Sequence, residues 1–252
     1  MNVTVQKVEL KVILPFRLLF LQECNFQIRY NACHERNWTD SYLISVGNVA
    51  VGYGSIKGKD NSADRDAVFE FYVVPHVRDY SGLLFKKLLE ISSARFIECQ
   101  SNDSILTPLL HEFSQNIESD VILFADDKVT HHKMPDVIFR KRKENDVPFE
   151  HTSEPVGDYI LDKDGEVVAT GGFLLHYNIP FADLYMEVKE NYRGRGLGSF
   201  LLQEVKKACY QSGRVPAARC NIQNLASKAC LIKAGLHVCG QMQSGNVSLP
   251  GI

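Results

Sequence analysis

The stretch Arg193-Gly194-Arg195-Gly196-Leu197-Gly198 lies between an apolar strand pattern and a helical pattern. Three glycines at alternate positions allow the backbone to approach a ligand closely. The free N–H groups at the start of the following helix would point toward that ligand, and two Arg side chains would flank it, which is how a diphosphate is bound. The spacing differs from the Walker loop and from the GxGxxG of dinucleotide-binding folds. A tight packing turn is the alternative interpretation.

The residues downstream of this turn predict a mixed α/β (α+β) sheet. Gly213 ends a helix whose apolar stripe has helical spacing: Leu197, Leu201, Val205 and Ala208. Residues 217–222 have the composition of a buried strand, and residues 224–234 predict a short helix capped by Asn224 or Ser227, with Gly235 just past its end. The order hairpin, strand, turn, helix, strand, helix is typical of a mixed sheet with helices packed on it.

An internal repeat organises the chain. The segment Gly47–Gly54 recurs loosely as Gly165–Gly172, at an offset of 118, and each copy predicts a β-hairpin. Phe69–Val73 recurs as Leu184–Val188 at an offset of 115. A period above 100 residues is domain-sized, far longer than a solenoid repeat. The sequence therefore predicts a duplicated domain.

The charged stretch Lys141–Asp146 is the predicted linker between the two copies. The predicted domains are residues 1–145 and residues 146–252.

Length and composition exclude several classes of protein. With 252 residues, 45% of them apolar and 23% charged, the chain has room for two globular domains and is neither disordered nor fibrous. The longest apolar run, Val12–Leu21, contains Pro15 and Arg17 and is about half the length of a membrane span. The N-terminus lacks a secretory-signal pattern, and seven cysteines without CxxC are typical of reduced thiols. We expect a cytoplasmic protein without a membrane partner.

Positive charge is concentrated late in the chain. Residues 189–235 carry a net charge of +7, which leaves −9 for the remainder because the total is −2. Such a block favours a polyanionic partner, although a solvated basic helix face is the alternative. Nucleic acid is not expected, because few aromatic side chains are available there to stack on bases: Tyr192, Phe200 and Tyr210.

The run Met186–Leu202 resembles the acyl-CoA-binding motif of the GNAT superfamily of N-acetyltransferases, whose pattern Arg/Gln-x-x-Gly-x-Gly/Ala falls on Arg193, Gly196 and Gly198. The continuation Asn221–Ser227, ending in Lys233-Ala234-Gly235-Leu236, resembles the second motif of that family. The resemblance covers about residues 157–240. It implies two GNAT-like acyl-CoA N-acyltransferase domains in tandem, of which the first is degenerate.

The resemblance implies an N-acetyltransferase that moves an acetyl group from acetyl-CoA, as co-substrate, to a primary amine of a small-molecule or peptide acceptor by direct attack. The pyrophosphate of acetyl-CoA would lie on the backbone amides of residues 193–199, and the pantetheine arm would follow the strand that ends at Val188. The residues that this resemblance assigns to the coenzyme are Met186, Val188, Arg193, Gly194, Arg195, Gly196, Leu197, Gly198, Ser199, Asn221, Asn224 and Ser227.

Acetyl transfer at such a site needs a group that accepts a proton from the amine and a group that stabilises the oxyanion. An amine with a pKa of about 10.4 must lose a proton before it attacks. Glu187 is the nearest carboxylate for that base role, with a structural or solvated Glu as the alternative. Tyr185 and His176 are two further candidates for proton transfer, and a surface His is the alternative interpretation of His176. The backbone N–H of Val188 is the oxyanion donor that the resemblance implies.

Leu231 stands where many members of the family carry a Tyr that protonates the departing thiolate. Cys230 and Ser227 lie one turn away, with a packed small residue as the alternative for each, and water is the remaining proton source. This departure supports the alternative function, a non-catalytic acyl-CoA-binding or regulatory protein.

The first copy departs from the motif. Its turn, Arg78–Leu83, has Ser81 and Leu83 at positions that are glycines in the second copy. A Leu side chain would obstruct a phosphate and Asp79 would repel it, so we expect one coenzyme site in the chain. The pairs Cys33-His34 and His131-His132 lack metal-ligand spacing, and no metal is expected.

The second copy lacks a helical period before its hairpin. Asp146–Val156 contains two prolines, so the two helices that wall the acceptor side in single GNAT domains are predicted to be missing. We therefore expect the acceptor to bind between the two halves of a monomer or homodimer. Its contacts would come from a pool of polar residues: Arg17, Gln22, Glu23, Asn25, Gln27, Asn102 and Asp103.

Overall fold

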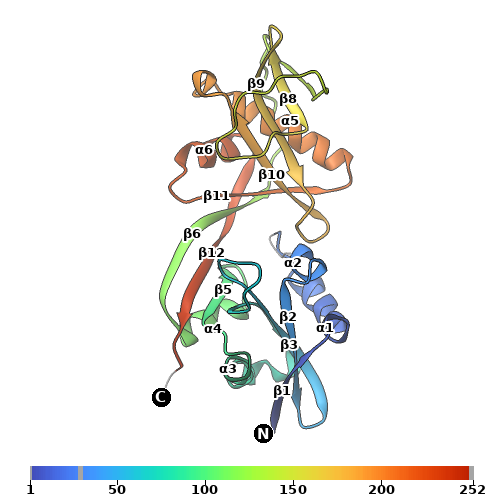
Figure 1. Cartoon of the computed structure of the whole chain (residues 1–252), viewed down its shortest axis with the longest axis vertical. Helices are drawn as coiled ribbons and strands as arrows, with labels where there is room; N and C mark the ends of the chain where they lie inside the picture. Colours follow the sequence, from blue (N-terminus) through green and yellow to red (C-terminus); the bar gives the residue numbers. More distant parts are fainter. Residues whose placement is uncertain (1, 28–30, 250–252) are drawn as a thin grey trace. The chain divides into compact units, whose positions relative to one another are not determined.

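A computed structural model describes residues 2–27 and 31–249 (Figure 1). The described chain forms two compact units. Unit 1 contains residues 2–26, 31–120 and 240–249, and unit 2 contains Gln27 and residues 121–239. Strands β6 (Ser114–Asp126) and β12 (Leu236–Val247) contribute residues to both units. The predicted domain boundary at 145/146 lies inside unit 2.

Unit 1 is a mixed sheet with helices on both faces. Its helices are α1 (Leu10–Glu23), α2 (Asn31–Glu35), the 3₁₀ helix η1 (Pro75–Tyr80), α3 (Ser81–Ser92) and α4 (Leu106–Phe113). Its strands, in spatial order, are β1 (Val3–Val8), β2 (Thr39–Val46), β3 (Val49–Lys57), β4 (Ala67–Val73) and β5 (Phe96–Gln100), followed by the later part of β12. The β4–β5 pair is parallel, whereas the β1–β2, β2–β3, β3–β4 and β5–β12 pairs are antiparallel.

Alternation along the strands of unit 1 divides its core into two layers. Tyr53 and Tyr72 pack with Phe20 of α1 on one face of the sheet. Phe71 and Val73, the neighbours of Tyr72 on β4, pack instead in the cluster that holds the apolar side chains of α3 and α4.

The strands of unit 2 also form both parallel and antiparallel pairs. Its strand order is β6, β11 (Val215–Asn221), β10 (Phe181–Val188), β9 (Glu166–Leu174), β8 (Tyr159–Lys163) and β7 (Ile138–Lys141). The β10–β11 pair is parallel, and the β6–β11, β9–β10, β8–β9 and β7–β8 pairs are antiparallel. Helix α5 (Leu197–Gln211) packs against β8 to β11, and α6 (Leu225–Lys233) packs against α5 and β11. A short 3₁₀ helix, η2 (Glu190–Tyr192), precedes the glycine turn.

The structure confirms the predicted local elements. The two hairpins are β2–β3 and β8–β9, and their turns hold Gly47 and Gly165 at φ 60° and 84°. The predicted strand and short helix are β11 and α6, and the Asn224 side chain accepts a hydrogen bond from Ser227 N at 3.0 Å. Gly235 follows α6 at φ 92°, a left-handed conformation that glycine adopts without a Cβ penalty.

The second face of the unit 2 sheet carries no helix among the described residues 142–158, as the prolines predict. The stretch expected to be a linker starts within β7, which pairs with β8. Arg140 on β7 binds Asp146 at 2.7 Å and Asp162 at 2.7 Å, and these ion pairs tie the segment to the β8 strand. This pairing is why β7 and the residues that follow it belong to unit 2.

The strand beside β11 comes from far upstream in the sequence. Residues Val121–Ala125 of β6 pair antiparallel with Ala217–Asn221 of β11. Unit 2 therefore completes its sheet with residues that precede the repeat copy, and its contiguous part, residues 121–239, includes the connector 127–137 that leads to β7.

Candidate functional site

The glycine turn of unit 2 has the backbone conformation of an anion cradle. Gly194 and Gly196 adopt φ 76° and 81°, and α5 starts directly after Gly196. Left-handed residues in a tight turn can direct neighbouring backbone N–H groups toward one concave side, and the first turn of a helix adds further unpaired N–H groups. A Cβ added at Gly194 would meet no heavy atom within 4 Å, so the positive φ, and not a lack of space, is what favours glycine there. The residues present fit a diphosphate.

Two arginines beside the turn are exposed and held by backbone oxygens. Arg193 Nε donates to Val188 O at 3.1 Å, and Arg195 donates to Asn191 O at 3.0 Å. The Arg195 guanidinium also lies over the Tyr192 ring, 5.2 Å from its centroid. These bonds orient both cations at the mouth of the cradle, where they would neutralise phosphate charge.

Strands β10 and β11 diverge beside this turn. Their ladder runs only from Phe181↔Val215 to Asp183↔Ala217, whereas β9 pairs with β10 as far as Val188. Lys189 N donates to Val168 O of β9 at 3.0 Å. By strand alternation the N–H of Val188 points the other way, toward the side from which β11 has diverged. The opening therefore leaves a backbone N–H at Val188, the residue to which the family resemblance assigns the oxyanion donor.

The remaining predicted coenzyme residues fall into two groups. Met186, Leu197, Gly198 and Ser199 lie at the end of β10 and the start of α5, and a Cβ at Gly198 would come within 3.1 Å of Met186 Cε. Asn221, Asn224 and Ser227 lie at the end of β11 and the start of α6. The carboxyl ends of parallel strands meet at one edge of a sheet, so both groups belong to the edge at which ligands bind in such folds.

Local hydrogen bonds already use the second group. Asn221 Oδ1 accepts from Gln223 N at 2.8 Å, and Asn224 Oδ1 caps α6. These residues shape the turn between β11 and α6, and their contact with a coenzyme stays a prediction.

Glu187 is buried and fully bonded. Its carboxylate accepts five hydrogen bonds of 2.9–3.1 Å from the backbone and hydroxyl groups of Thr152 and Ser153 and from the backbone N–H of Glu154. Burial opposes ionisation, but these donors outweigh it and lower the pKa of Glu187 to about 2. A carboxylate so engaged is a weak proton acceptor at neutral pH, and its visible role is to hold the loop 152–154.

The loop bound by Glu187 is the feature that sequence reasoning missed. Thr152, Ser153 and Glu154 stand in a segment without periodicity or motif, 33 to 35 residues before their partner. The one signal in the sequence is that Thr152 and Ser153 are consecutive residues with both backbone N–H and side-chain O–H donors, which is a combination that can bind a carboxylate.

The turn of unit 1 is built differently. Residues Pro75–Tyr80 form a 3₁₀ helix that continues into α3, and Ser81 has φ −52°, so no left-handed residue interrupts the backbone. Arg78 Nε nevertheless donates to Val73 O at 3.3 Å, as Arg193 does to Val188 O. The repeated contact supports the duplication, and the missing left-handed residues explain physically why unit 1 lacks the cradle.

Several residues of the predicted acceptor pool have structural partners. Arg17 forms two hydrogen bonds of 3.0 Å with the buried carboxylate of Glu70, and Glu23 binds Tyr72 and Arg78. In the same pool, Asp103 Oδ1 accepts hydrogen bonds from the backbone N–H of Ile105 and Leu106 where α4 begins, and Gln27 Nε2 contacts Cys239 Sγ. The location of the acceptor stays a prediction.

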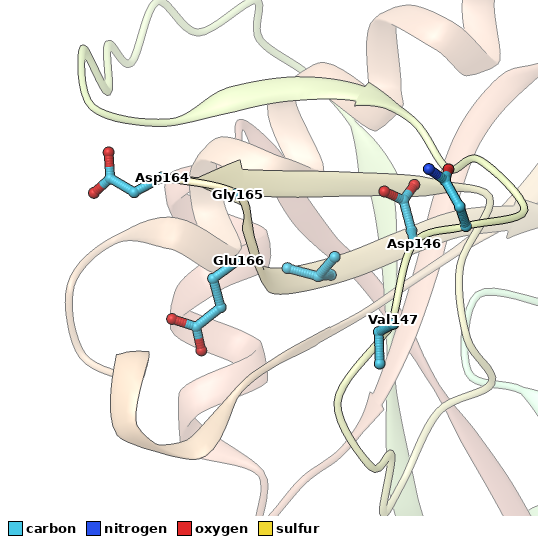
Figure 2. Close-up of a pocket in the computed structure, with 7 residues that line it drawn as sticks. Asp146, Val147, Asp164, Gly165 and Glu166 are labelled. Atoms are coloured by element: carbon cyan, nitrogen blue, oxygen red, sulfur yellow. The ribbon is translucent and has the colours of Figure 1, made fainter.

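A surface hollow at the β8–β9 turn is an unsuitable phosphate site (Figure 2). Asp146, Asp164 and Glu166 contribute carboxylates to its lining. Asp146 and Glu166 are paired with Arg140 and Lys189 respectively, so no cation is left to attract a phosphate there. The acidic lining would repel a diphosphate.

No helix in the described part of the chain is long and apolar enough to cross a membrane. Residues 2–27 and 31–249 contain no cluster of His, Cys, Asp and Glu suited to a metal ion.

Comparison with known proteins identifies a family for part of the chain. The family model described as the acetyltransferase (GNAT) family matches residues 125–236, nearly the contiguous part of unit 2. No curated protein matches the sequence.

Solved structures share the fold over nearly the whole chain. A GNAT-family acetyltransferase from Colwellia psychrerythraea superposes with a TM-score of 0.74 at 14% identity, covering 97% of this chain and 100% of that one. A tandem GNAT protein from the clavulanic acid biosynthesis pathway gives 0.62 at 10% identity, with coverage of 99% and 100%. A GCN5-related N-acetyltransferase from Sphaerobacter thermophilus gives 0.60 at 14% identity, with coverage of 99% and 97%.

Proposed function

Because residues 125–236 form a GNAT-family acetyltransferase domain within a chain that has the tandem GNAT fold, we propose that unit 2 transfers an acetyl group from acetyl-CoA to a primary amine. Acyl transfer is the chemistry of that family. What we propose beyond that family chemistry is the identity of the donor, acetyl-CoA, and the class of the acceptor, a primary amine.

The observation that carries the proposal is the glycine cradle beside the opening between β10 and β11. Two left-handed glycines and the start of α5 offer N–H groups for a diphosphate, and Arg193 and Arg195 supply positive charge. The Val188 N–H faces the opening, where it can stabilise the oxyanion that forms as the amine attacks the thioester carbonyl.

Leu231 is 4% exposed and packs in the apolar core of unit 2. It has no proton to give, so the departing thiolate takes its proton from the attacking nitrogen or from water. The same feature supports the second candidate, a protein that binds acyl-CoA without transferring the acyl group.

Two measurements separate these candidates. Calorimetric titration of the full chain with acetyl-CoA should give one site per chain, because only unit 2 has left-handed glycines in the corresponding turn. A panel of primary amines should then include acceptors that raise the release of free CoA thiol above hydrolysis. Binding without amine-dependent release favours the non-catalytic candidate, and no binding contradicts both.

A further inference from the structure

The face of β10 opposite α5 holds a set of polar side chains. Leu184 and Met186 pack in the apolar core with α5. Side chains alternate along a strand, so Asp183, Tyr185 and Glu187 face the other side of the sheet. This is the side that carries no helix in unit 2, and the loop 152–154 lies over it through its bonds to Glu187.

Glu154 is the charged residue of that loop. Its backbone N–H donates to Glu187 Oε2 at 3.0 Å, which fixes its place over β10. Among residues 2–27 and 31–249, no group donates a hydrogen bond or forms an ion pair with its carboxylate. Glu187, by contrast, has its carboxylate filled by five donors.

The two carboxyl groups therefore differ in basicity. Partial desolvation, together with the negative charges of Asp183 and Glu187, raises the pKa of Glu154 despite the opposing charge of Arg219. Burial and the charges of Asp158 and Glu154 likewise raise the pKa of Tyr185 on the same face. When the environments of two neighbouring carboxyl groups give them different pKa values, the group with the higher pKa commonly transfers protons and the other stays ionised.

Asp183 is the other carboxylate on this face. It lies 3.2 Å from His176 Nε2 and 3.6 Å from Arg219 Nε, so its charge is shared with two basic groups. Within residues 2–27 and 31–249, Glu154 is left as an unpaired carboxylate on a loop whose backbone is bonded to a β10 side chain.

We propose that Glu154 is the proton acceptor for the incoming amine and that Glu187 is its positioning residue. This inference rests on the proposed function. A protonated amine gives one proton to the Glu154 carboxylate. The freed lone pair then forms the C–N bond to the thioester carbonyl while the C–S bond breaks. The second nitrogen proton leaves with the thiolate as free thiol, and Glu154 returns its proton to water.

The main test replaces Glu154 by Gln in the full chain, with Glu150→Gln as the matched control in the same exposed segment. Loss of a positioned base lowers turnover by about 100- to 10,000-fold. We expect Glu154→Gln to lose kcat to this extent while its Kd for acetyl-CoA stays unchanged, and Glu150→Gln to behave as wild type. Glu154→Asp should recover part of the rate.

A pH profile distinguishes proton transfer from a structural role. The acidic limb of kcat/KM reports the pKa of the free base. In Asp183→Asn a neighbouring negative charge is removed, so the limb should move to lower pH. In Glu154→Gln the limb should disappear. Full activity of Glu154→Gln, or an unmoved limb in Asp183→Asn, overturns the proposal.

A direct titration does not depend on finding an acceptor. Carboxyl NMR of wild-type protein, assigned with Glu154→Gln, should show Glu154 titrating above an ordinary Glu. A Glu154 that titrates at or below the ordinary value refutes the assignment even if amine-dependent thiol release is found. Acetyl-CoA binding without thiol release from any amine overturns the proposed function instead, and the catalytic role of Glu154 with it.

Discussion

Gly194 and Gly213 form a matched pair for testing the coenzyme cradle. Their φ values are 76° and 77°, and a Cβ added at either position meets no heavy atom within 4 Å. An Ala in the left-handed conformation costs about 1–2 kcal/mol at either site. We therefore expect Gly194→Ala and Gly213→Ala to lower the free energy of unfolding by similar amounts.

The two variants should differ in their affinity for acetyl-CoA. Only at Gly194 does the added methyl group lie in the turn where we place the diphosphate, whereas Gly213 lies beyond the far end of α5. Loss of one hydrogen bond to a charged group is worth about 1.5–3 kcal/mol. Since about 1.4 kcal/mol is tenfold, Gly194→Ala should bind acetyl-CoA about 10- to 150-fold more weakly.

Calorimetric titration measures the affinities, and urea unfolding measures the stabilities of the same samples. Equal affinity of both variants and wild type would refute the placement of the diphosphate on this turn. An equal loss of affinity in both variants would show that global strain, and not the cradle, is responsible.

Three further predictions concern stability and reactivity. Glu70→Gln leaves the buried Arg17 guanidinium without its carboxylate and should lower the free energy of unfolding by about 3–5 kcal/mol in urea titrations at pH 7. Burial opposes the ionisation of Glu70, but the charges of Arg17 and His34 hold its pKa well below the ordinary value. Its stabilisation is present above the unfolded-state pKa and is lost as pH falls toward the folded-state pKa, so acid should destabilise wild type more than Glu70→Gln; equal acid sensitivity would contradict this. Burial raises the pKa of the Cys209 thiol to about 11, so alkylation followed by mass spectrometry at pH 8 should label it only after denaturation. Asn224→Ala removes the cap of α6 and should cost about 1 kcal/mol of stability, which Asn224→Asp should retain in the same unfolding assay.

Local features of the chain could be predicted from the sequence because their causes are local. The apolar spacing from Leu197 onward and the stop at Gly213 define α5, and the cap at Asn224 and the glycine at 235 define α6. The contrast between the two turns was also visible, because Ser81 in place of a glycine removes the freedom to adopt a positive φ.

The sequence by itself therefore determined the mixed strand arrangement, the duplication and the position of the glycine turn. The tertiary structure alone decided which strand completes unit 2 beside β11 and which carboxylate of β10 has its oxygens bonded by a distant loop. The first depends on Val121–Ala125 pairing with residues about 95 positions later, as the register Val121↔Asn221 to Ala125↔Ala217 shows. The second depends on the loop 152–154 reaching Glu187, and this contact between distant residues leaves no periodicity in the sequence. Hydrogen bonds across such separations lower the basicity of Glu187, and desolvation and neighbouring charges raise that of Glu154, so residue type alone does not reveal either.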